Sequence, residues 1–336
     1  GKISFKEKPR ILIVPHAGID YSGNVVSKGF KQIKGMDILR VIILGSSHTS
    51  RFDYAALDNN DFWETPLAKT QVDSDFVETL TNGTSVRIDN SVHLKEYSLE
   101  MELIFLQKVL GDFKIVPIIL GQVSDGLISS LAEKIAYNFD DNTLIVVSSD
   151  LSHYPDWQTA NISDKRIIDS IISGDAQVFE RQLKEIESEN YKGLETPACG
   201  KDAIKVALKT AKLLGIKKFE KIAYENSGDV TEEKLKVVGY GAVLGYSQKI
   251  FYEFGEPDAL TKKEALDIAR NTLEKYLRSG KIEDVPPQDE YLNKSLGAFV
   301  TLTKNGQLRG CIGEFDPIKP LYKVIQDTVI SSATKD

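Results

Sequence analysis

Three histidines of the chain stand directly after short apolar runs, and they are the residues best suited to metal binding or acid–base catalysis. His16, His48 and His153 follow residues 11–15, 41–47 and 144–152. Such runs are typical of buried parallel strands, and ligands of parallel sheets bind in the loops just beyond the carboxyl ends of the strands. A single histidine at a strand end is more often structural, but three in the same position predict one shared site. Histidine is also the commonest metal ligand and an acid or base near neutral pH.

Cys199 is the second candidate, because it stands in Thr196-Pro-Ala-Cys-Gly-Lys-Asp202 at the predicted start of a helix. The positive end of the helix dipole stabilises a thiolate and should lower the thiol pKa. The alternative is a small buried apolar residue, the usual environment of an unpaired cysteine. With His16 and His48 available, this cysteine becomes a candidate soft metal ligand, since two imidazoles and a thiolate suit zinc or copper.

Asp150, three residues before His153, opens a second ligand set. Two histidines and one carboxylate are typical of non-haem Fe(II) sites. Asp150 fits the N-cap of a helix equally well, so both metal sets remain open. His93 is the weakest of the four histidines by pattern. It precedes a predicted helix over residues 98–110, whose start Ser98 can cap.

Composition narrows the class of protein. Apolar residues make up 41% and charged residues 27%, as in ordinary globular proteins, and 336 residues suit two domains better than one. The net charge is −7 and no basic block is present, so the sequence favours no nucleic-acid partner. No apolar run approaches the roughly 20 residues of a membrane span.

Two cysteines and no signal peptide predict a cytoplasmic, reduced protein. The chain does not begin with methionine, so we expect the natural protein to start earlier. A disulfide between the two cysteines has little support.

From about residue 10 to residue 246 the pattern alternates between strand and helix, which predicts an α/β fold with a mostly parallel sheet covered by helices on both faces. The expected strands are 11–14, 41–44, 86–88, 114–120, 143–147, 218–226 and 237–246. The expected helices are 24–33, 73–81, 98–110, 124–138, 162–173, 176–186 and 201–214. We expect a long loop around Trp63-Glu-Thr-Pro66.

Residues 1–246 are thus expected to form the first domain and residues 247–258 a linker. Residues 259–336 show a new pattern, with Thr261 and Glu264 at the spacing of a capping box that opens a helix to Leu277.

A hairpin is expected next, because apolar segments at 298–304 and 307–313 flank Asn305-Gly306, a pair that fits a type I′ turn. A final helix should start near Pro320. One hairpin and two helices give a small core, so we expect a smaller, incomplete α/β domain whose apolar faces are open and which proteases degrade first.

Several separated motifs of this chain resemble, in order, those of the MEMO family, which is similar to the class III (LigB-like) extradiol dioxygenases. They are Pro15-His-Ala-Gly18 with Tyr21-Ser-Gly23, Gly45-Ser-Ser-His48, His93-Leu-Lys-Glu-Tyr-Ser-Leu-Glu100, Ser148-Ser-Asp-Leu-Ser-His153, Cys199-Gly200 and Ser227-Gly-Asp-Val with Val238-Gly-Tyr240. The segment Leu308-Arg-Gly-Cys-Ile-Gly313 is similar to the AMMECR signature. The whole resembles a MEMO–AMMECR fusion of the AmmeMemoRadiSam set, truncated at both ends.

The resemblance implies an extradiol-dioxygenase-like fold and a metal site at His16, His48 and Cys199. It also implies Asp150, His153 and His93 as acid or base groups around that site. Two departures matter. Tyr97 stands where the family usually has histidine, and Cys199 stands where a dioxygenase supplies a carboxylate.

The leading hypothesis is a cytoplasmic metal-binding protein with an extradiol-dioxygenase-like site that does redox or oxygen chemistry on a small molecule. In this hypothesis the cofactor is a divalent or redox metal ion, Fe, Cu or Zn, and the sequence does not select among the three. His153, Asp150 and His93 are the predicted catalytic groups and His16, His48 and Cys199 the predicted metal ligands. The alternative is a non-catalytic metal- or peptide-binding scaffold that works with a radical SAM partner. Neither hypothesis involves nucleic acid or a membrane.

Overall fold

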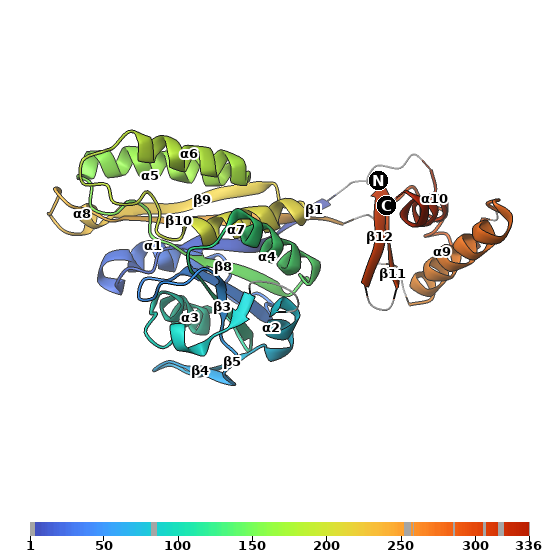
Figure 1. Cartoon of the computed structure of the whole chain (residues 1–336), viewed down its shortest axis with the longest axis horizontal. Coiled ribbons are helices and arrows are strands. Elements are labelled where there is room, and N and C mark those ends of the chain that lie inside the picture. The colour runs from blue at the N-terminus through green and yellow to red at the C-terminus, as the bar shows by residue number, and fades with distance from the viewer. Residues whose placement is uncertain are drawn as a thin grey trace. The chain divides into compact units, whose positions relative to one another are not determined.

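The computed structural model describes residues 4–81, 86–251, 257, 259–284, 286–304, 307–314 and 319–335. The chain divides into two compact units (Figure 1). The larger is Lys6–Lys249, and the smaller joins Gly1–Phe5 to Ile250–Asp336.

A ten-stranded sheet forms the larger unit. Its main path runs in the order β4-β5-β7-β2-β8-β1-β10-β9, and β3 and β6 pair beside β7. The strands are β1 Ser4–Val14, β2 Arg40–Ser46, β3 Ala55–Leu57, β4 Phe62–Glu64, β5 Lys69–Val72, β6 Val86–Ile88, β7 Lys114–Leu120, β8 Thr143–Ser148, β9 Lys218–Asn226 and β10 Gly239–Phe251. The centre is parallel, since β2 pairs in parallel with β7 and β8, and β8 with β1.

Helices cover both faces of this sheet (Figure 1). They are α1 Ile19–Lys31, α2 Ser74–Thr81, α3 Ser98–Val109, α4 Asp125–Tyr137, α5 Trp157–Ile172, α6 Ala176–Ser188, α7 Lys201–Leu213 and the short α8 Ser227–Val230, with a 3₁₀ turn at Asn90–Val92. Gly241 lies against Ile168 of α5, whereas Ala242 lies beside Gly29 of α1. Adjacent strand residues point to opposite faces, so α1 and α5 cover opposite faces of the sheet.

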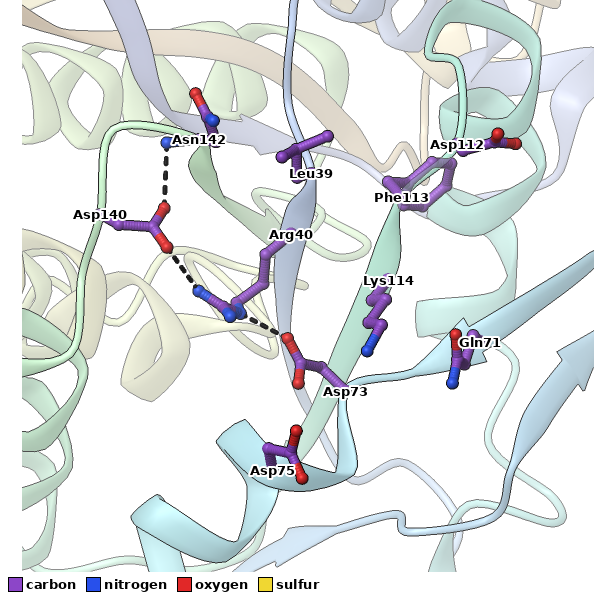
Figure 2. A pocket seen from close by; sticks show the side chains of 10 residues that line it. All are labelled: Leu39, Arg40, Gln71, Asp73, Asp75, Asp112, Phe113, Lys114, Asp140 and Asn142. Atoms are coloured by element: carbon purple, nitrogen blue, oxygen red, sulfur yellow. Dashed lines mark hydrogen bonds and ion pairs between the residues drawn. The ribbon is translucent and has the colours of Figure 1, made fainter.

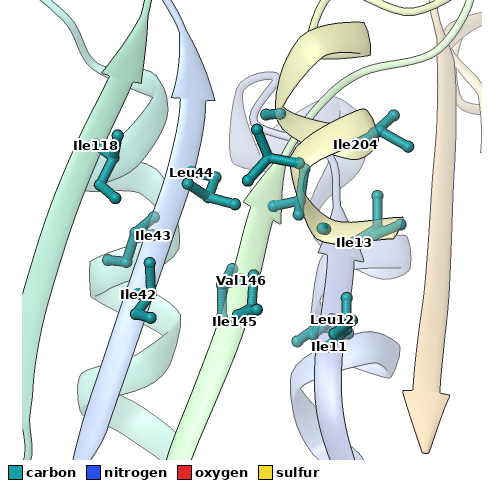
Figure 3. Close-up of a cluster of buried hydrophobic side chains, with 14 of the residues drawn as sticks. Ile11, Leu12, Ile13, Ile42, Ile43, Leu44, Ile118, Ile145, Val146 and Ile204 are labelled. Carbon is teal, nitrogen blue, oxygen red and sulfur yellow. The ribbon is translucent and has the colours of Figure 1, made fainter. Parts of the chain in front are cut away.

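The core lies where the central strands meet these helices (Figure 3). Ile11, Ile42 and Ile145 are fully buried on three neighbouring strands, and Ile204 of α7 belongs to the same buried cluster. A strand buried on both faces needs a continuous apolar run, which is why the sequence shows runs rather than alternation here. The predicted α/β class is confirmed.

The loop around Trp63 and the linker both differ from the expected elements. The long loop around Trp63 contains three short strands, β3, β4 and β5, which are too short for a hydrophobic period to reveal. β10 continues to Phe251, so the first residues of the expected linker are strand. They extend because β10 lies between β9 and β1, and Ser247 accepts a hydrogen bond from Arg10 of β1. Residues 252–256 and 258 lie outside the described residues.

The smaller unit contains helix α9 (Ala259–Ser279), a hairpin of β11 (Ala298–Lys304) and β12 (Gln307–Glu314), and helix α10 (Leu321–Thr334). The expected turn at Asn305-Gly306 lies outside the described residues. The core of this unit is small. Its buried centre is Leu292, Tyr322 and Ile325. Large apolar side chains of α9 are exposed at Leu260, Leu266 and Leu277.

Within the described residues, no helix has the length and apolar character that a bilayer span requires.

Candidate metal centre

Three strands position side chains of the site in the same way, two residues beyond their carboxyl ends. His16 lies two residues beyond the end of β1, His48 two beyond β2 and Asp150 two beyond β8. These strands are neighbours in the order β2-β8-β1 and run parallel, so their carboxyl ends meet at one edge of the sheet. The three side chains therefore converge, although the sequence separates them widely.

Cys199 joins them from the residue before Gly200, which caps α7. Its Sγ lies 3.6 Å from Nε2 of His16, and the rings of His16 and His48 have centroids 4.9 Å apart. One ligand atom from each of these three residues lies within 4.8 Å of the others. Metal–ligand bonds of roughly 2.0–2.3 Å require separations of this order, so the three side chains can share one ion.

The other ring nitrogen of each histidine is already engaged. Nδ1 of His48 is 3.0 Å from Oε1 of Glu96, and Nδ1 of His16 is 2.8 Å from the hydroxyl of Ser148. Metal-bound histidines almost always use one ring nitrogen for the ion and the other for such a partner. Both Nε2 atoms are thereby left to face a common point.

Asp150 and His153 form a second group with the same cysteine. Oδ1 of Asp150 accepts the backbone N–H of His16 and of Ala17, at 3.0 and 3.2 Å. Its Oδ2 lies 3.8 Å from Nε2 of His16 and 4.0 Å from Nε2 of His153. Nε2 of His153 is buried and has no hydrogen-bond partner among the described residues. A substrate or an ion can satisfy that nitrogen.

The thiol of Cys199 behaves differently from expectation. Burial raises its pKa well above the ordinary value, and the negative charge of Asp150 raises it further. The helix start was predicted to lower the thiol pKa, but burial outweighs that effect. The thiol is enclosed by the loop of Asp150 and accepts the N–H of that residue at 3.2 Å. A bound cation acts in the opposite direction, since metal binding displaces the thiol proton.

The two histidines are held in different electrostatic states. Burial lowers the pKa of His16, so this ring is neutral and can offer a lone pair. The hydrogen bond to Glu96 raises the pKa of His48. Burial pushes the pKa of Glu96 upward, but the hydrogen bonds from His48 and Ser98 prevail and bring it to about 2.

Comparison with known proteins decides the family. Residues 2–244 match the family model described as Memo-like protein, and residues 266–336 match the AMMECR1 model. The chain belongs to the Memo-like family. A MEMO1 family protein of Nitrosopumilus maritimus is 35% identical over 235 residues, which cover 69% of this chain and 82% of the relative. Another, of Thermotoga neapolitana, is 34% identical over 241 residues, covering 70% and 82%.

A solved structure of an uncharacterized protein, JW3007 from Escherichia coli K12, is 11% identical. It superimposes on 70% of this chain and 99% of its own length with a TM-score of 0.49, and this likeness is too weak to bear on function.

The Memo-like unit does not bring His93 into the cluster. Nε2 of His93 lies 3.2 Å from the carbonyl oxygen of Ala56, and its ring makes a T-shaped contact with the ring of Trp63. Neither ligand group includes it. Tyr97 does border the cluster, with its ring centroid 6.0 Å from that of His16 and 6.0 Å from that of His48.

Glu96, Ser148 and Glu102 are parts of this site that sequence reasoning missed. Glu102 could have been noticed, because it falls on the buried face of α3 between Leu99 and Leu106, where a charged residue is unusual. Glu96 and Ser148 leave no comparable sequence signal. Their roles depend on which histidine nitrogen they reach.

The Memo-like unit has a separate cavity at the opposite edge of the sheet (Figure 2). It measures about 510 Å³ and lies where β2 and β7 begin, at Arg40 and Lys114. Arg40 is held by ion pairs to Asp73 at 2.6 Å and Asp140 at 2.8 Å. These pairs tie the amino end of β2 to the segment after β5 and to the loop before β8, so we interpret the cavity as structural.

Proposed function

We propose that this Memo-like protein binds a first-row transition-metal ion through His16, His48 and Cys199, and that it does redox or oxygen chemistry on a small molecule there. One observation carries the proposal. Nδ1 of His16 is hydrogen-bonded to Ser148 and Nδ1 of His48 to Glu96. Each ring therefore keeps Nε2 for an ion beside the thiol of Cys199. Two imidazoles and a thiolate suit zinc or copper, and Fe(II) would draw on Asp150 in place of the thiolate.

Asp150 and His153 supply the remaining chemistry. When bound, the ion would act as a Lewis acid or a redox centre. Burial lowers the pKa of His153, which keeps its ring neutral and able to take a proton from a substrate at Nε2. Asp150 is anchored by two backbone N–H groups, so its free oxygen can orient a donor group of the substrate.

The hypothesis of an extradiol-dioxygenase-like site is supported by the order of the sequence motifs and by the position of the proposed metal ligands at strand ends. We expect weak or no ring cleavage of simple catechols, however. A thiolate as the third ligand favours softer metals than Fe(II) and is itself oxidised readily.

A non-catalytic scaffold for a radical SAM partner is the second candidate. The observation that favours it is the second ligand group, because Asp150 and His153 lie near enough to complete the coordination of an ion at Cys199. A saturated ion has no open position for a substrate.

Metal content of the 336-residue chain tests the proposal. Protein purified anaerobically should carry a stoichiometric ion by elemental analysis, and His48→Ala should lose it. His93→Ala is the control, because it removes an imidazole of the same unit that lies outside both groups. Equal metal content in the two variants, or none in the wild type, would refute the site.

A small exogenous ligand then separates the two candidate functions. Azide added to the Cu(II) form, or nitric oxide added to the Fe(II) form, should change the electronic spectrum if a coordination position is open. His153→Ala should lower turnover of any substrate found while keeping the metal. Loss of the metal in that variant would make His153 a ligand and favour the scaffold.

A further inference from the structure

Behind the metal ligands lies a buried polar chain that the proposed function does not use. The side chain of Glu102, on α3, is fully buried. Its Oε1 is 2.9 Å from the hydroxyl of Ser148. The same hydroxyl is 2.8 Å from Nδ1 of His16 and 3.0 Å from the carbonyl oxygen of Ser98. One serine oxygen therefore meets three polar groups at hydrogen-bonding distance.

Counting protons fixes the direction of these bonds. A hydroxyl has one proton to donate and two lone pairs to accept with. The carbonyl of Ser98 can only accept, so it takes the single proton of Ser148. The two other neighbours must then donate to Ser148, which requires a proton on Nδ1 of His16 and a proton on the carboxyl group of Glu102.

An ionised Glu102 would break this arrangement. A carboxylate only accepts, and one hydroxyl proton cannot serve both it and the carbonyl of Ser98. One of two contacts of about 3 Å would then join two acceptors, an unsatisfied arrangement that is costly in a buried site.

We propose that Glu102 is a neutral carboxylic acid that donates a hydrogen bond to Ser148. Glu102 and the carbonyl of Ser98 thereby hold the Ser148 hydroxyl as an acceptor for Nδ1–H of His16, which fixes the ring orientation and the tautomer of that histidine. This role rests on the proposed metal site. With the proton on Nδ1, the lone pair of His16 is on Nε2, the atom that faces Cys199. Glu102 is thus a positioning residue, separated from the ion by two side chains.

The surroundings of Glu102 agree with a neutral acid. No lysine, arginine or histidine forms an ion pair with it within the described residues, and its second oxygen is buried without a hydrogen bond. Burial raises the pKa of Glu102 well above its usual range, and the charge of Asp150 adds to that effect. A charge left unpaired in such a place costs far more than a neutral polar group.

Two substitutions separate a neutral acid from an ionised one. Glu102→Gln keeps the shape, the neutrality and a donor toward Ser148, so Zn(II) affinity measured against a competing chelator should stay at the wild-type value. Glu102→Leu removes the donor and should weaken Zn(II) binding by about 10- to 100-fold, the usual cost of losing a partner of a metal ligand. Ser163→Ala is the control, because it removes another fully buried hydroxyl, in α5, away from this chain of bonds. Loss of affinity in Glu102→Gln, or unchanged affinity in Glu102→Leu, would overturn the inference.

The tautomer is measured without any metal, which separates this inference from the proposed function. The chain has four histidines, so long-range ¹H–¹⁵N spectra of metal-free protein above pH 7 are simple, and His16→Asn assigns the relevant signals. We expect the Nδ1–H form at His16 in the wild type and in Glu102→Gln. An Nε2–H form would refute the positioning role even if zinc binds. A wild type that binds no zinc but shows the Nδ1–H form would refute only the metal site.

Discussion

Replacing Asp164 by asparagine should change how the stability of the larger unit depends on pH. Asp164 is fully buried on α5. It accepts the backbone N–H of Ser152 and the hydroxyl of Tyr224, both at 2.9 Å. Burial raises its pKa from 3.8 to about 7. Asparagine has the same shape, can keep both contacts and never ionises.

The sign and size follow from linkage between protonation and folding. The raised pKa means that the folded state holds a proton that the unfolded state releases, so wild-type stability falls as pH rises from 3.8 to about 7. Each unit of difference between the folded and unfolded pKa is worth about 1.4 kcal/mol, so the free energy of unfolding falls by about 4 kcal/mol in total. Between pH 5 and pH 8 it amounts to about 3 kcal/mol. The stability of Asp164→Asn relative to the wild type should therefore rise by about 3 kcal/mol between pH 5 and pH 8.

Urea unfolding followed by tryptophan fluorescence measures this difference. Both tryptophans, Trp63 and Trp157, lie in the larger unit, so the signal reports that unit alone. Asp156→Asn is the control. Asp156 caps the same helix, and the N–H of Thr159 lowers its pKa, so it is ionised in both states across this interval. A difference between Asp164→Asn and the wild type that stays constant from pH 5 to pH 8 would refute a raised pKa at Asp164.

Three further substitutions test the packing and the site. Gly200→Ala would place a Cβ 2.6 Å from Cβ of Ser149. It should therefore lower the free energy of unfolding in urea by about 1–3 kcal/mol and weaken Zn(II) binding by displacing Cys199. Unchanged zinc affinity would contradict this. Glu96→Gln should lower the pKa of His48, measured by NMR titration, and reduce Zn(II) affinity about 10- to 100-fold; an unmoved His48 pKa would argue against their hydrogen bond. Phe30→Ala removes a fully buried ring and should cost about 3–5 kcal/mol in urea, with a loss below 1 kcal/mol counting against a packed core.

The sequence alone determined the elements that position the site. Strands buried on both faces must be continuous apolar runs, so β1, β2 and β8 are visible as such, and the histidines after them mark one edge of a parallel sheet. The order of the motifs also indicated the Memo-like family. Strands of three or four residues, such as β3 and β4, carry no such signal, and the sequence placed a loop there.

Only the tertiary structure decided what each group in the site can do. The thiol pKa of Cys199 depends on burial and on Asp150 rather than on its helix, and its contact with His16 joins residues 183 apart in the chain. The partners that select Nε2 of each histidine, Glu96 and Ser148, act through distances of about 3 Å. Sequence patterns record which face of an element is apolar, because burial of whole faces drives folding. They do not record hydrogen bonds between single atoms, and these set tautomers, proton affinities and metal binding.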